Sequence, residues 1–194
     1  MKKDIILSGV GGQGILSIAT VIGRAALEEG LQIKQAEVHG MSQRGGDVQS
    51  NLRISSSRID SDLIARGGAD LIISLEPMEA LRYLPWLAAD GWVITNTTPF
   101  VNIPNYPDAE ALQHELASLP HVVALDVDSL AKAAASPRSA NMVLLGAAAP
   151  FLGLEAGKFE QGIRAIFARK GDAVVEMNLA AFRAGYEQAK KQIR

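Results

Sequence analysis

The glycines near the amino terminus have the types and spacing of a turn that binds phosphate. Gly9, Gly11 and Gly14 fit the pattern G-x-G-x-x-G. An apolar run, residues 4–10, precedes the turn, and apolar residues recur at helical spacing after Ile15. In a strand–turn–helix unit, free backbone N–H groups and the positive end of the helix point at the same place. The sequence therefore predicts an anion site in one turn, formed by Gly9, Gly11, Gly12, Gln13 and Gly14.

A second glycine-rich segment, residues 39–46, is expected at the carboxyl end of the next strand, beside this turn. Open α/β sheets bind ligands at that edge. Arg44 supplies a rigid, permanently charged fork that suits phosphate or carboxylate. The glycines allow the backbone to approach a ligand or a partner chain closely. Four residues join the predicted site: Gln43, Arg44, Gly45 and Gly46.

The residues alone leave alternatives open. Glu37 lies 23 residues past Gly14, roughly where an acid binds ribose in dinucleotide folds, so an NAD(P)-dependent dehydrogenase is one interpretation. The alternative interpretation is that the glycines serve only close packing and that Arg44 is a solvated residue of a hairpin. Asn96 and Asn141 can bind a ligand or cap local backbone. Four aromatic residues, Phe100, Tyr106, Trp86 and Trp92, flank the proline-rich residues 97–107. A partly exposed cluster of them would mark a partner interface, and packing in the core is the alternative.

The elements that position these residues alternate between strand and helix along the chain. Apolar runs predict strands at residues 4–10, 31–38, 48–54, 71–75, 91–96 and 122–127. A helix is expected from Pro77 to about Trp86, and Asp108 and Ser139 are expected to cap later helices. The strand at 48–54 follows too closely for a helical crossover and should be antiparallel. The prediction is one domain, residues 1–194, a three-layer α/β/α sandwich with a Rossmann-like, mixed but mostly parallel sheet.

Composition excludes several classes of function. The chain has no cysteine, so it cannot form a disulfide, supply a thiol nucleophile, or hold thiolate zinc or an iron–sulfur cluster alone. Its three histidines show no metal-ligand spacing, and no catalytic constellation stands out. A net charge of −2 offers no basic field for nucleic acid. No apolar run is long enough to span a membrane and no signal peptide is evident, so the cytoplasm is the expected compartment.

Three motifs together resemble the gamma-subunit family of 2-oxoacid:ferredoxin oxidoreductases: Gly9-Val-Gly-Gly-Gln-Gly14, Gln43-Arg-Gly-Gly46 and Arg53-Ile-Ser55. Three longer runs are similar to the beta (small) subunits of indolepyruvate ferredoxin oxidoreductases: Glu37-Val-His-Gly-Met-Ser-Gln-Arg-Gly-Gly46, Ala69-Asp-Leu-Ile-Ile-Ser-Leu-Glu-Pro-Met-Glu-Ala-Leu-Arg82 and Gly157-Lys-Phe159. The resemblance covers nearly the whole chain.

The resemblance implies a subunit rather than a complete enzyme. In that family a large (alpha) partner carries thiamine diphosphate, Mg and the iron–sulfur clusters, and this chain alone holds no cofactor. The complex oxidatively decarboxylates an arylpyruvate to an aryl-acetyl-CoA and passes electrons to ferredoxin. The glycine turns are then expected near coenzyme A or at the subunit interface. Two other hypotheses stay open beside it: the free-standing dehydrogenase, and a non-catalytic scaffold whose glycine loops contact only a partner chain.

Overall fold

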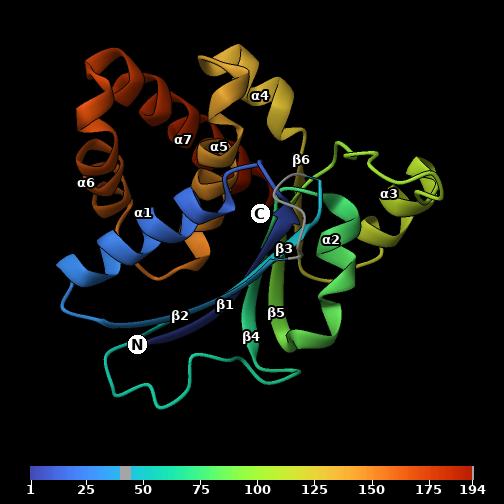
Figure 1. The fold of residues 1–194 in the computed structure, drawn as a ribbon, viewed down its shortest axis with the longest axis horizontal. Helices are drawn as coiled ribbons and strands as arrows, with labels where there is room; N and C mark the ends of the chain where they lie inside the picture. Colours follow the sequence, from blue (N-terminus) through green and yellow to red (C-terminus); the bar gives the residue numbers. More distant parts are fainter. Residues whose placement is uncertain (40–44, 194) are drawn as a thin grey trace.

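A six-stranded mixed sheet forms the centre of the computed structural model, which describes residues 1–39 and 45–193 (Figure 1). The strand order is β2-β3-β1-β4-β5-β6. Strand β3 runs antiparallel to both neighbours, and the other neighbouring pairs are parallel. The predicted mixed sheet and its antiparallel strand are therefore confirmed. The strands are β1 (Lys2–Val10), β2 (Gln32–His39), β3 (Asp47–Ser55), β4 (Ala69–Ser74), β5 (Leu87–Asn96) and β6 (Val122–Leu125).

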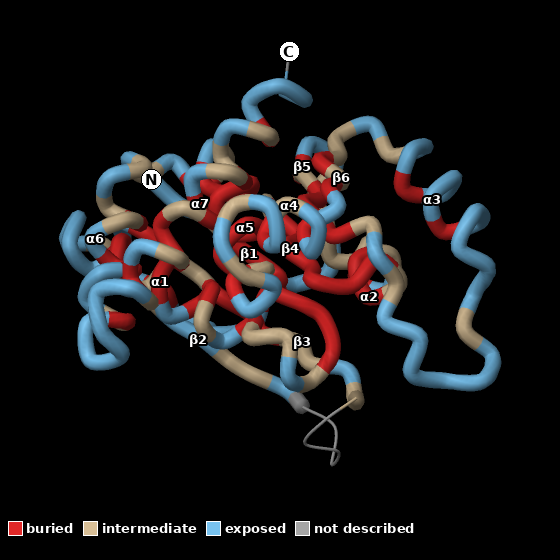
Figure 2. The backbone as a smooth tube through the Cα atoms, turned by 90° about the horizontal axis from the view of Figure 1, so that it is seen from above, coloured by how far each residue is buried: buried red, intermediate tan, exposed pale blue. Residues whose placement is uncertain are grey.

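Helices cover both faces of the sheet and complete the three layers (Figure 1). One face carries α1 (Ile15–Glu28), α4 (Val127–Ala134), α5 (Ala140–Ala148), α6 (Ala156–Phe167) and α7 (Asp172–Gln192). The other carries α2 (Pro77–Arg82) and α3 (Ala109–Ala117). Short 3₁₀ turns lie at Leu84–Trp86, Pro137–Ser139, Ala149–Phe151 and Ala168–Lys170. The α/β fold class is confirmed, and buried backbone follows the centre of the sheet and α5 (Figure 2).

The central helix α5 is held against α7 by two glycines at their crossing. A Cβ atom added at Gly146 would lie 1.9 Å from the carbonyl oxygen of Phe182. One added at Gly185 would lie 1.9 Å from the carbonyl oxygen of Val143. Backbone therefore packs on backbone at this point, where no larger side chain fits. This contact fixes the helical layer over the strands.

Helix ends differ from the prediction in two places. The expected helix at residues 77–86 stops at Arg82 and continues as the 3₁₀ turn Leu84–Trp86, because Pro85 has no N–H to donate. Ser139 precedes α5, but its side chain accepts no capping hydrogen bond. Asp108 caps α3 as predicted, accepting from the N–H groups of residues 110 and 111 at 3.0 and 3.1 Å.

The amino edge of the sheet is closed by an ion pair between β1 and β3. Arg53 Nε donates to Asp4 Oδ1 at 2.7 Å and Arg53 Nη2 to Asp4 Oδ2 at 3.0 Å. Arg53 Nη1 also donates to the carbonyls of Ser61 and Leu63, which holds the segment 56–68 on the sheet. Burial raises the pKa of Asp4, but Arg53 and Lys2 outweigh it, so that the pKa lies below its ordinary value. Arg53, part of the motif Arg53-Ile-Ser55, has a structural contact here.

Candidate functional site

The glycine turn joins the end of β1 directly to the start of α1. Gly12 and Gly14 have φ values of 102° and 86°, in the left-handed region that favours glycine. Four N–H groups in the turn and the first turn of α1 have no hydrogen-bond partner within the described part of the chain: those of Gly12, Gly14, Ile15 and Leu16. These donors lie at the positive end of the helix dipole. The turn therefore has the donors that an anion requires.

The two glycine segments meet, as the sequence predicted. Gly11 N–H donates to the carbonyl of Gly46 at 2.8 Å, and Gly45 N–H donates to the carbonyl of Gly11 at 3.4 Å. Both segments therefore lie at the carboxyl edge of the sheet, one across the other. Gln43 and Arg44, the other two residues predicted on the second segment, lie outside the described residues, so that their contacts stay predictions.

The side chain of Gln13 fixes the turn from within. Its Oε1 accepts from the N–H of Val10 at 2.8 Å, and its Nε2 donates to the carbonyl of Leu75 at 3.2 Å. Both ends of the amide are thus engaged by backbone, which ties the turn to the end of β4. Gly9 belongs to the same arrangement, since a Cβ atom there would lie 2.7 Å from Gln13 Oε1. The sequence did not reveal the bond to Leu75, because it joins residues 62 positions apart in the chain.

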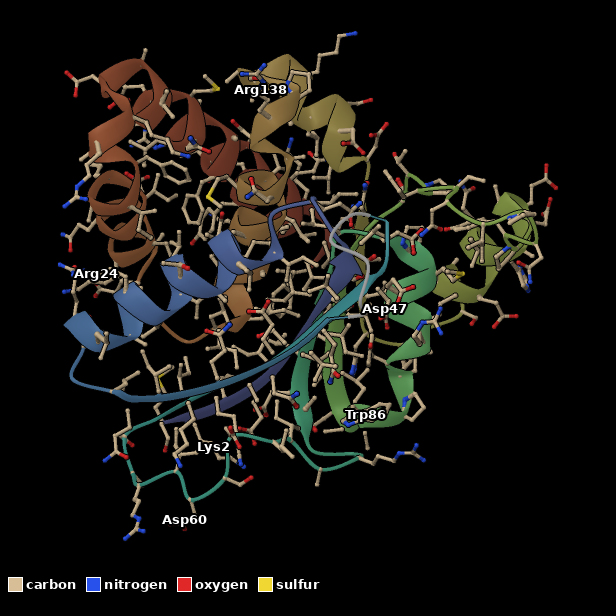
Figure 3. The ribbon with its side chains drawn as sticks, viewed as in Figure 1. Lys2, Arg24, Asp47, Asp60, Trp86 and Arg138 are labelled. Atoms are coloured by element: carbon tan, nitrogen blue, oxygen red, sulfur yellow. The ribbon has the colours of Figure 1, made fainter. Side chains whose placement is uncertain are left out.

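A crevice of about 350 Å³ opens between the ends of β1 and β4. After β1 the chain crosses to α1 on one face, whereas after β4 it crosses to α2 on the other. This is the switch point at which open α/β sheets bind ligands. Gly12, Gln13, Phe100 and Arg138 are among the residues that line it, and Arg138 is the one cation among its described lining residues. Figure 3 labels Arg138 beside the start of α5.

Asn96 and Asn141 line this crevice, and their side chains bind backbone within the chain. Asn96 Oδ1 accepts from the N–H groups of Thr98 and Val127, and its Nδ2 donates to Asp128 at 3.0 Å. Asn141 Nδ2 donates to the carbonyl of Gly14 at 3.2 Å, which joins α5 to the start of α1. Local capping therefore describes Asn96 at Thr98, whereas Asn141 makes a long-range contact that the sequence did not predict.

A second cavity, of about 290 Å³, lies on the other side of the turn and includes Gly11, Gly12 and Glu37 in its lining. Glu37 thus lies near the turn, as in a dinucleotide fold. However, β3 separates β1 from β2, and the carbonyl of Gly46 already occupies the N–H of Gly11. One donor of the turn is therefore already engaged, and the acid lies on a strand that is not the neighbour of β1 as it is in a dinucleotide fold. This arrangement does not favour the dehydrogenase alternative.

Two buried carboxylates lie at the end of β4, beside the crevice. Glu76 caps α2, and its carboxylate accepts from the N–H of Glu79 at 2.8 Å, from the N–H of Phe100 at 3.3 Å and from the hydroxyl of Tyr106. Glu79 pairs with Arg82 at 2.8 Å. Burial raises the pKa of Glu79 despite Arg82, and burial together with the bond to Glu76 raises the pKa of Tyr106.

Sequence reasoning missed the role of Glu76. A signal was present, since an acidic residue directly before a proline at the first helical position marks an N-cap. The predicted aromatic cluster does not form. Trp86 packs on Tyr83, and Trp92 stacks on His121 with ring centroids 5.1 Å apart. Trp86 lies toward the opposite edge of the sheet from Arg138 (Figure 3).

No group of three or more His, Asp or Glu residues in the described ranges could hold a metal ion. None of the helices formed by those residues is both long and apolar enough to cross a bilayer.

The chain resembles known proteins over nearly its full length. The family model described as pyruvate ferredoxin/flavodoxin oxidoreductase matches residues 4–188. Indolepyruvate oxidoreductase subunit IorB of Archaeoglobus fulgidus is 37% identical over 198 residues, covering 97% of this chain and 96% of that protein. The subunit of the same name from Pyrococcus horikoshii is 36% identical over 204 residues, covering 100% and 99%.

Solved structures share the fold. The gamma subunit of a keto/oxoacid ferredoxin oxidoreductase from Geobacter sulfurreducens superposes with a TM-score of 0.72 at 25% identity, covering 97% of this chain and 99% of that one. The 2-oxoglutarate:ferredoxin oxidoreductase of Magnetococcus marinus, solved with 2-oxoglutarate, coenzyme A and succinyl-CoA bound, gives a TM-score of 0.77 at 22% identity. It matches 98% of this chain but 31% of that longer chain, so the fold also occurs as one part of a larger polypeptide.

Proposed function

The chain belongs to the pyruvate ferredoxin/flavodoxin oxidoreductase family and is an oxidoreductase subunit of the 2-oxoacid:ferredoxin class. From that premise we propose that it is the small subunit of an arylpyruvate:ferredoxin oxidoreductase, acting as one domain. The complex would oxidatively decarboxylate an arylpyruvate such as indolepyruvate to an aryl-acetyl-CoA and CO₂, and pass the electron pair to ferredoxin. The proposal takes its substrate class from relatives at 34–37% identity.

The carboxyl edge of the sheet is the proposed contribution of this chain. Coenzyme A carries phosphates. The observation that carries the proposal is the set of N–H groups in the glycine turn that have no partner among the described residues, beside a crevice that includes Arg138 in its lining. Backbone donors at a helix start and an arginine fork are the groups that bind phosphate oxygens. Gly12 borders both cavities, so a ligand phosphate there would contact the turn from either side.

The redox cofactors are proposed to lie on the large partner subunit. A chain without cysteine has no thiolate for an iron–sulfur cluster, and its described residues offer no metal-binding group. Thiamine diphosphate, when bound with Mg to the partner, supplies the carbanion chemistry of decarboxylation. The residues of this chain would bind and orient the thioester-forming co-substrate. Their part is positioning, which raises the rate by holding reacting groups in place.

Reconstitution tests the proposal. The purified chain alone is expected neither to decarboxylate indolepyruvate nor to reduce a viologen dye. Adding the large subunit should give CoA-dependent viologen reduction. Turnover by the isolated chain would contradict the proposal, and so would tight NADH binding without any response to coenzyme A in titration calorimetry.

A further inference from the structure

Exposed apolar side chains concentrate at one edge of the molecule. The structure describes nine large apolar residues that are exposed: Met1, Leu16, Leu27, Val38, Leu63, Phe100, Val101, Ile103 and Ile193. Five of these lie at the carboxyl edge of the sheet: Leu16 in the first turn of α1, Val38 near the end of β2, and three in the segment 97–107 after β5. Figure 2 shows that the tube between β5 and α3 is mostly exposed.

These positions are connected through the glycine segments. Asn102 Nδ2, within segment 97–107, donates to the carbonyl of Gly45 at 2.6 Å. Gly45 in turn donates to Gly11, and Gly11 and Leu16 line the same cavity. The apolar side chains therefore lie at the same edge of the sheet as the polar glycine turn. Exposed apolar side chains that gather beside a site mark a surface that contacts another molecule.

Segment 97–107 is held in a defined conformation from beneath. The fully buried Glu76 accepts from Phe100 N–H near its middle and from the Tyr106 hydroxyl near its end. These two bonds and that of Asn102 fix the backbone while Val101 remains 71% exposed. The apolar tips are thus presented to solvent by a backbone that is already ordered. A preorganised surface loses less conformational entropy when it binds.

We propose that segment 97–107, anchored by Glu76, is the surface on which the large catalytic subunit docks. This inference rests on the proposed function. Phe100 and its neighbour Pro99 line the crevice at the end of β4, so a chain that covers this segment also closes the crevice. Under the proposed function, coenzyme A binds in this crevice and must reach the thiamine diphosphate of the large subunit from there. The covering chain is therefore the one that carries the cofactor, and not a second copy of this chain.

The test measures the dissociation constant between this chain and the large subunit for two pairs of variants. Val101→Glu and Ile103→Glu place a charge on the proposed surface. Leu63→Glu and Leu27→Glu place the same charge on exposed apolar positions elsewhere, 58% and 61% exposed. We expect the first pair to weaken association at least tenfold and the second pair to leave it within twofold. Because all four positions are exposed, their unfolding midpoints should match the unmodified chain, which circular dichroism checks.

Each other outcome has a distinct meaning. Unchanged association of Val101→Glu and Ile103→Glu, with a normal complex of the unmodified chain, overturns this inference and leaves the proposed function standing. If the substitutions weaken self-association of this chain but leave its dissociation constant for the large subunit unchanged, the surface binds a second copy and the inference is wrong. If the unmodified chain does not bind the large subunit at all, the proposed function itself fails.

Discussion

The two ends of the sheet each use a buried carboxylate to hold a loop, but they satisfy it differently. At the amino edge, Asp4 is neutralised by Arg53, which also holds segment 56–68. At the carboxyl edge, Glu76 has no lysine or arginine partner within the described residues and is met by neutral donors, two of them from segment 97–107. Asp4 is thus paired with a cation on the neighbouring strand, whereas Glu76 is bound by the same loop whose position it fixes.

This difference indicates which end of the sheet contributes to folding stability and which end binds the partner subunit. A carboxylate paired by a bidentate arginine within the sheet gives a fixed structural element. A carboxylate whose donors belong to an exposed loop makes the loop position depend on a few hydrogen bonds. Substitutions at the amino edge should therefore lower the free energy of unfolding, and substitutions at the carboxyl edge should weaken binding. Three substitutions test this comparison.

Asp4→Asn should have the largest effect on stability. It leaves Arg53 without its counter-charge in a partly buried position, and breaking one side of such a pair costs roughly 3 kcal/mol. The pKa of Asp4 is lowered in the folded chain, so its stabilisation is present above its unfolded pKa and disappears as pH falls through the folded value. Urea unfolding between pH 7 and pH 3 should show a shallower loss for the variant than for the unmodified chain. If Asp4→Asn kept a normal free energy of unfolding but bound the large subunit more weakly, the amino edge would be the binding edge, contrary to this assignment.

Glu76→Gln should have a smaller global effect and a marked local one. The amide keeps one acceptor oxygen and places an NH₂ group opposite a donor. One bond, either to Glu79 N–H or to segment 97–107, is therefore lost, and the remaining bonds lose the charge that strengthens them, about 2 kcal/mol in all. Removing a charge near Glu79 offsets part of that loss. Amide hydrogen exchange should accelerate in segment 97–107 and stay unchanged in segment 56–68. Glu160→Gln, which breaks a partly exposed pair with Arg183, is the matched control and should change stability by about 0.5 kcal/mol. If the substitution changed the exchange rates of segments 97–107 and 56–68 equally, Glu76 would not be the anchor of segment 97–107.

Arg138→Ala should leave stability almost unchanged, because Arg138 is exposed. In the reconstituted complex we expect an apparent KM for coenzyme A about tenfold higher, equivalent to about 1.4 kcal/mol, with kcat retained. Arg24→Ala, an exposed arginine that pairs with Glu28 on α1, is the control and should not change that KM. If Arg138→Ala instead prevented assembly of the complex, and the fraction that still assembled had the KM of the unmodified complex, the scaffold hypothesis would be favoured.

The sequence predicted those features that depend on local signals. The apolar run of β1, the glycine turn and the antiparallel β3 follow from residues close together in the chain. The meeting of Gly45 and Gly46 with the turn followed from the general rule that ligand-binding loops share the carboxyl edge.

The features it could not predict depend on contacts between distant residues. Gln13 binds the carbonyl of Leu75, 62 residues away, and Glu76 binds Tyr106, 30 residues away. Arg138 reaches the crevice from a 3₁₀ turn that no periodicity marks. Trp86 and Trp92 lie near the proline-rich segment in sequence but pack elsewhere. Trp86 precedes β5 and Trp92 lies within it, so all or part of the strand separates each of them from the segment that follows β5.

Hydrogen–deuterium exchange of the free chain and of its complex with the large subunit compares the two edges in a single measurement. On complex formation we expect slower exchange in residues 11–16 and 97–107, with residues 56–68 unchanged. Protection confined to residues 56–68, with the glycine turn and segment 97–107 exchanging as in the free chain, would contradict it.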